Sequence, residues 1–165
     1  MTQLEQQLTS FLDTKPSIVG IGNSLRKDDG VGVLIAGSLS ERANKAGFNV
    51  FNAEDVIESY LSDITNADSE NVLIIDAVAA DLEPGDIIFG SFDEINTDKT
   101  ALSTHKLSIE LSIKIMKQRG KTPYLLGIQP SDTQYGFGLT TPVAKSADYI
   151  ISCFTNSFKN QEIGE

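Results

Sequence analysis

Residues 71–76 have the sequence Asn-Val-Leu-Ile-Ile-Asp, in which four branched apolar residues stand in a row. Such a run is typical of a buried parallel strand that is covered on both faces. Similar short apolar runs occur at 17–22, 48–51 and 124–128, and another at 87–89 follows a Glu-Pro-Gly-Asp turn. The segment 87–89 comes too soon after 71–76 for a helical crossover, so we expect an antiparallel edge strand there.

The segments between these strands show the spacing of amphipathic helices. They are about 30–45, 57–65, 103–119 and 141–158. Strands that alternate with helices predict an α/β fold, here a three-layer sandwich. We expect a mostly parallel five-stranded sheet with helices on both faces. The 165 residues suit one domain, with a core at about 17–158.

Composition argues against several classes of protein. The chain has 13 basic and 23 acidic residues and a net charge of −10, which disfavours binding to nucleic acid. The single cysteine, Cys153, cannot form an internal disulfide. No run approaches the ~18 apolar residues of a membrane span, and residues 1–10 do not resemble a signal peptide. We therefore expect a cytoplasmic protein, and a monomer.

Ligands of open α/β sheets bind beyond the carboxyl ends of the strands. Asp28 and Asp29 follow the first predicted strand, Asp76 ends the third, and His105, the single histidine, lies near the start of a predicted helix. Each has an ordinary explanation when taken alone. An aspartate there caps a helix or binds loop amides, and a lone histidine usually lies on the surface.

Taken together, Asp29, Asp76 and His105 would supply two carboxylate oxygens and one imidazole nitrogen at one edge of the sheet. This donor set suits nickel, zinc or ferrous iron and leaves coordination positions open. A helix N-terminus also favours the neutral, ligating imidazole. The glycines after the first strand do not form a dinucleotide fingerprint, because Leu25 takes the place of the third glycine.

Several short motifs resemble, in order, those of the [NiFe]-hydrogenase maturation endopeptidases. The resemblance extends over roughly residues 17–150. Its pieces are Gly20-Ile21-Gly22-Asn23-Ser24-Leu25, Asp28-Asp29-Gly30-Val31-Gly32, Leu73-Ile74-Ile75-Asp76-Ala77, Pro84-Gly85-Asp86-Ile87, Ser103-Thr104-His105, Gly127-Ile128-Gln129-Pro130 and Gly138-Leu139-Thr140-Thr141-Pro142-Val143. The Thr-His and Gly-Ile-Gln-Pro pieces are most similar to the branch that processes the large subunit of formate-hydrogenlyase-type hydrogenases.

The resemblance implies an endopeptidase that removes the C-terminal extension of a hydrogenase large-subunit precursor after nickel insertion. The family's metal-contacting positions correspond to Asp29, Asp76 and His105. The nickel is then largely the substrate's own, and no organic cofactor is implied. Either a carboxylate activates water or the metal polarises the peptide carbonyl. Residues 52–58 are more acidic and bulkier than the glycine-rich stretch of many relatives.

Two alternatives remain at this level. A hydrolase that holds its own zinc would use the same three side chains. A non-catalytic domain of the receiver or flavodoxin-like type would share the fold, but a receiver needs a lysine at the end of the fifth strand. This chain has Gly127-Ile128-Gln129-Pro130 there.

Overall fold

The computed structural model describes residues 1–95 and 106–163. Its centre is a five-stranded sheet with the strand order β2-β1-β3-β5-β4. The strands are β1 (Ser17–Ile21), β2 (Val50–Glu54), β3 (Asn71–Ala77), β4 (Ile87–Ser91) and β5 (Thr122–Ile128). All neighbouring pairs are parallel except β4 and β5, which are antiparallel. The predicted α/β fold with a mixed, mostly parallel sheet is confirmed.

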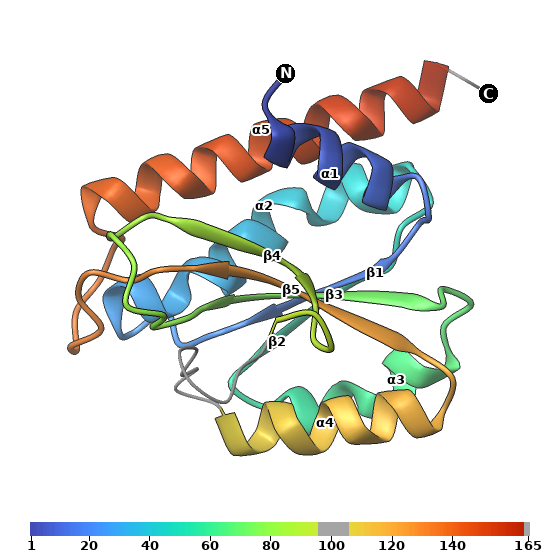
Figure 1. Ribbon diagram of the computed structural model, residues 1–165, viewed down its shortest axis with the longest axis horizontal. Helices are drawn as coiled ribbons and strands as arrows, with labels where there is room; N and C mark the ends of the chain where they lie inside the picture. Colours follow the sequence, from blue (N-terminus) through green and yellow to red (C-terminus); the bar gives the residue numbers. More distant parts are fainter. Residues whose placement is uncertain (96–105, 164–165) are drawn as a thin grey trace.

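Helices cover both faces of the sheet (Figure 1). On one face lie α1 (Gln3–Leu12), α2 (Val31–Lys45) and α5 (Thr141–Ile163), and on the other lie α3 (Leu61–Asn66) and α4 (Lys106–Gln118). Two short 3₁₀ helices, η1 (Lys27–Gly30) and η2 (Ile57–Tyr60), precede α2 and α3. Buried apolar side chains form two separate clusters, as expected when both faces of a sheet are covered.

Helix α1 was not predicted from the sequence, because its glutamines obscure a narrow apolar stripe. Leu8, Phe11 and Leu12 of this helix are buried. The Phe11 ring lies 5.3 Å from the ring of Phe89 and 4.5 Å from that of Tyr124. A capping box between Thr2 and Glu5 begins the helix. The N-terminal segment thus covers the β4–β5 side of the sheet.

The largest differences from the predicted bounds are those of β2 and α5. β2 spans 50–54 rather than 48–51, because the Phe48 side chain is buried against Phe158, with 4.8 Å between the ring centroids. The Phe48 N–H donates to the carbonyl of Ala43, which ties this residue to the end of α2. α5 continues to Ile163 rather than to residue 158. In this added part of the helix, the side-chain amide of Gln161 donates to the Leu12 carbonyl at 3.3 Å.

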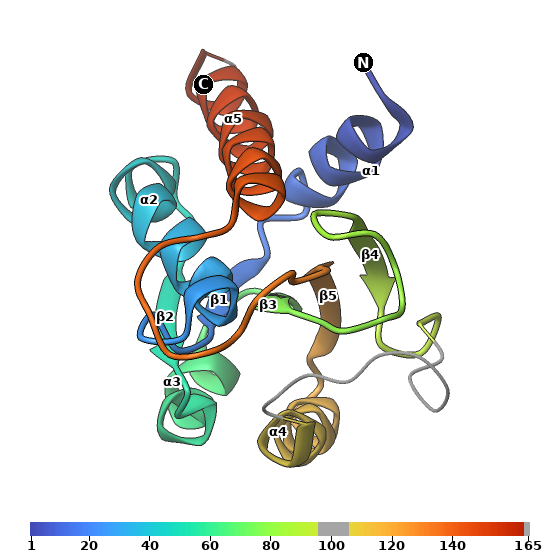
Figure 2. The same cartoon turned by 90° about the vertical axis from the view of Figure 1, so that its left-hand side faces the viewer.

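Within residues 1–95 and 106–163, none of the helices combines the length and the apolar character that crossing a bilayer requires. The segments that follow β1 and β5 lie together at one end of the sheet (Figure 2). The long connection between β5 and α5 passes in front of η1 and the start of α2 in this view. This carboxyl end of the sheet is the edge at which the sequence predicted a site.

Candidate functional site

Asp76 and Asp29 are both buried at the carboxyl end of the sheet. Asp76 is the penultimate residue of β3, pairs with Gly127 of β5 and is 0% exposed. One of its carboxylate oxygens accepts the N–H of Ala77 at 2.8 Å. Asp29 lies in η1 and is 1% exposed. Ionisable side chains are rarely buried to this degree unless they are paired, bonded or functional.

Glycines bring η1 and α2 against the strand ends. A Cβ atom at Gly32 would lie 2.1 Å from the carbonyl oxygen of Ile75, the residue before Asp76, and 2.4 Å from that of Ile21. Gly22 has a φ of +148°, and a Cβ atom there would lie 2.0 Å from the Asp29 carbonyl oxygen. Only glycine permits these approaches, which set the segment that carries Asp29 beside the end of β3.

The carboxylate of Asp28 anchors a distant loop and does not cap α2. It is fully buried and accepts four hydrogen bonds from the β5–α5 connection. The donors are the N–H groups of Ser131 at 2.9 Å, Asp132 at 3.0 Å and Thr140 at 2.7 Å, and the Thr140 hydroxyl at 2.8 Å. The helix-cap explanation was therefore wrong for Asp28, because these partners lie more than 100 residues away.

The same two segments are joined along their backbones. Gly136 donates to the carbonyl of Leu25 at 2.9 Å, and its own carbonyl accepts the N–H of Lys27 at 3.1 Å. The Lys27 ammonium lies 2.7 Å from the carboxylate of Asp132, and this hydrogen bond, with one from the Gln134 N–H, lowers the pKa of Asp132. Lys27 itself has a φ of +48°. This left-handed conformation costs ~1–2 kcal/mol in residues other than glycine.

Gln129 orders the loop that follows Asp76. Its side-chain oxygen accepts the N–H of Ala80 at 2.8 Å and that of Leu82 at 3.3 Å. Its backbone accepts from Gly85 and donates to Asp86. Gln129 belongs to the Gly-Ile-Gln-Pro motif, from which no role for its side chain was predicted. No local pattern reveals one, because the residues it binds lie on a different strand connection.

A cavity of about 420 Å³ opens between the β1–η1 segment and the end of β2. Its lining consists of Gly22, Asn23, Ser24, Leu25, Glu54 and Asp55. Glu54 has a φ of +53°, so a second strained residue lies at this end of the sheet. The acidic stretch at 52–58 therefore borders a cavity near Asp29.

His105, the third predicted site residue, lies outside the residues that the structure describes. Among residues 1–95 and 106–163, no three histidine, cysteine or acidic side chains are grouped so that they could hold a metal ion. The predicted set includes His105, so its assembly with Asp29 and Asp76 stays a prediction.

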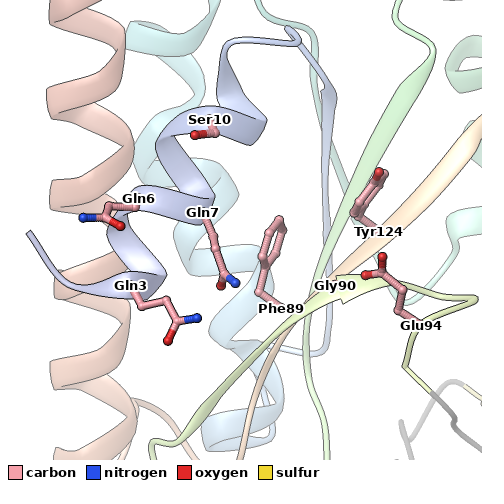
Figure 3. Close-up of a pocket in the computed structure, with 8 residues that line it drawn as sticks. All are labelled: Gln3, Gln6, Gln7, Ser10, Phe89, Gly90, Glu94 and Tyr124. Atoms are coloured by element: carbon pink, nitrogen blue, oxygen red, sulfur yellow. The ribbon is translucent and has the colours of Figure 1, made fainter.

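Another cavity, of about 520 Å³, lies between α1 and the β4–β5 edge (Figure 3). Glutamines of α1 line one side, and Phe89, Gly90, Glu94 and Tyr124 line the other. Tyr124 pairs with Ser91 near the start of β5, whereas Asp76 pairs with Gly127 near its end. This cavity is thus separate from the acidic edge.

Fold and site together define a three-layer α/β protein with two buried aspartates at the carboxyl end of its sheet. A family model described as "Hydrogenase maturation protease" (HycI) matches residues 33–157. The chain belongs to the hydrogenase maturation protease family.

Relatives agree with this assignment. The chain is 28% identical over 146 residues to a putative hydrogenase maturation protease of Methanocaldococcus jannaschii, covering 86% of this chain and 95% of the relative. It is 27% identical over 130 residues to the hydrogenase 3 maturation protease of Escherichia coli, covering 79% and 82%. The crystal structure of the protease HycI from Thermococcus kodakarensis superposes with a TM-score of 0.77 at 29% identity, covering 93% and 99%.

Proposed function

We propose that this protein is an endopeptidase that removes the C-terminal extension of a hydrogenase large-subunit precursor after nickel has been inserted. Family membership supports the peptidase activity and the kind of substrate. The observation that carries the proposal is the burial of both Asp29 and Asp76 at the carboxyl end of the sheet, on segments that the glycine contacts hold together.

The nickel is part of the substrate in this proposal. Asp29, Asp76 and His105 contact the ion that the precursor carries, and carboxylate and imidazole donors suit nickel. This contact positions one peptide bond of the precursor beside the two aspartates. The buried setting supports such a role, because charges excluded from water interact strongly with a cation.

The cleavage we propose is of the aspartic type. A carboxylate of the pair accepts a proton from water, and the water oxygen attacks the peptide carbonyl carbon. When the C–N bond breaks, the proton passes to the released amine, and the water oxygen remains in the new carboxyl group. The atoms balance without any further reactant.

Incubation with matched precursors tests the proposal. Nickel-loaded and nickel-free large-subunit precursors are mixed with the protein, and loss of the C-terminal extension is followed by mass spectrometry. We expect cleavage of the nickel-loaded form alone. Efficient cleavage of the nickel-free form would instead support a hydrolase that holds its own metal, and cleavage of neither would contradict peptidase activity on this substrate.

A further inference from the structure

Two aromatic side chains project into solvent beside the candidate site. Tyr135 is 82% exposed and Phe137 is 86% exposed, and Leu25, on the neighbouring segment, is 54% exposed. We call these three residues the aromatic patch. Large apolar side chains that gather on a surface commonly mark an interaction site, and tyrosine and phenylalanine are enriched at the centres of interfaces.

The loop that carries the patch is held in place at several points. Gly136, between the two aromatic residues, is bonded to the backbones of both Leu25 and Lys27. The guanidinium of Arg26 lies 5.6 Å from the centroid of the Tyr135 ring, and its Nε donates to the Thr133 carbonyl at 3.1 Å. The bonds to Asp28 add further anchors. A loop that is ordered in advance loses little conformational entropy when a partner binds.

The anchors also place the patch next to the acidic edge. Asp28, which holds the loop, directly precedes Asp29, and the loop begins after β5, the strand that pairs with the end of β3. Leu25 belongs to the patch and also lines the cavity that Glu54 and Asp55 border. An apolar surface with acidic residues on one side is therefore continuous with the candidate site.

We infer that the aromatic patch is the docking surface for the body of the precursor that this enzyme cleaves. The inference rests on the proposed function. The occupant is a surface of the precursor with apolar side chains at its centre and basic side chains facing Glu54 and Asp55. Charge complementarity supports this choice, because the chain carries a net charge of −10 and acidic side chains border the patch.

Substitution of the aromatic residues tests the inference. The variants are Tyr135→Ser with Phe137→Ser, the milder Phe137→Leu, and Ile163→Ser as a matched control. Ile163 is 83% exposed but lies at the far end of α5 (Figure 1). For the double variant we expect KM for the nickel-loaded precursor to rise tenfold or more with kcat nearly unchanged. Phe137→Leu retains most of the binding, and Ile163→Ser retains all of it.

Direct binding separates this inference from the proposed function. Calorimetric titration with the nickel-loaded precursor needs no cleavage, so it still tests the patch if the wild-type protein proves inactive. Weaker binding of the double variant alone supports docking. Equal binding of the wild type and the double variant overturns the inference. A double variant that cleaves normally but has a different oligomeric state also overturns it, because the patch would then bind a second copy of this chain. No binding by the wild type would overturn both the inference and the proposed function.

Discussion

Asp28 and Thr140 lie 112 residues apart, yet two hydrogen bonds of 2.7 and 2.8 Å join the Asp28 carboxylate to the backbone N–H and the hydroxyl of Thr140. The adjacent carboxylate of Asp29 comes from the same short helix. Neighbouring aspartates thus have different tasks in our interpretation. Asp28 secures the β5–α5 loop, and Asp29 contacts the substrate's nickel in the proposed function.

Replacing Asp28 is expected to reduce stability. Asp28→Ala removes the acceptor of four hydrogen bonds and leaves partly buried N–H groups without this partner, so we expect the free energy of unfolding to fall by about 2–4 kcal/mol. Urea denaturation followed by circular dichroism measures the loss. Asp29→Asn is the matched control, and we expect it to stay within ~1 kcal/mol of wild type while cleavage is abolished. A stable Asp28→Ala protein would show that the loop is held by other contacts.

Asp76→Asn separates a chemical role from a structural one. Asparagine can still accept the hydrogen bond from Ala77, so we expect the thermal midpoint to change little. Asparagine lacks the negative charge of the carboxylate and is a weaker ligand for the nickel ion that we propose Asp76 contacts. Cleavage of the nickel-loaded precursor should therefore fall at least about a hundredfold. Both readings come from the same preparation. Cleavage by this variant at the wild-type rate would show that Asp76 has a purely structural role.

Gly32→Ala is expected to distort the site from within α2. Its Cβ atom would lie 2.1 Å from a backbone oxygen of β3, and backbone yields less readily than a side chain. Overpacking of this kind costs ~1–3 kcal/mol. Gly37→Ala in the same helix is the control, because its Cβ would meet nothing closer than the Asn52 side-chain nitrogen at 3.6 Å. We expect this control to match or exceed wild-type stability by up to ~1 kcal/mol, as measured by thermal unfolding.

Acidification should weaken the Lys27–Asp132 anchor. The pKa of Asp132 in the folded protein lies below its ordinary value of 3.8, because the hydrogen bond to Lys27 favours the carboxylate. Such a group stabilises the fold above its unfolded pKa, and this contribution is lost as the pH falls through the folded pKa. The thermal midpoints of wild type and Asp132→Asn should therefore differ more at pH 7 than below pH ~3. A difference that is constant across this range would contradict the assignment.

The parts of the fold that follow local patterns could be predicted from the sequence. The run of branched residues at 72–75 indicated a central parallel strand, and the short connection to β4 indicated an antiparallel edge. Helix α1 was not predicted, because its buried face is narrow. Its position becomes clear only from the packing of Phe11 against Phe89 and Tyr124. Its stability depends on tertiary contacts more than on local propensity.

Some residues of the candidate site could likewise be predicted from the sequence, and others could not. The rule for strand ends selected Asp29 and Asp76, and the structure places both at the carboxyl end of the sheet. The supporting roles of Asp28 and Gln129 could not be predicted, because their partners come from other loops. Long-range hydrogen bonds of this kind leave no periodic signal in the chain.

The strand order has a consequence for synthesis on the ribosome. β4 is translated before β5, the strand with which it pairs, and about 30 residues separate the end of one from the start of the other. A nascent chain that stops before residue 122 can align β1, β2 and β3, but it leaves β4 without this neighbour and Phe89 without Tyr124. The Thr140 bonds to Asp28 form later still, so the acidic edge is complete only after residue 140 has been translated.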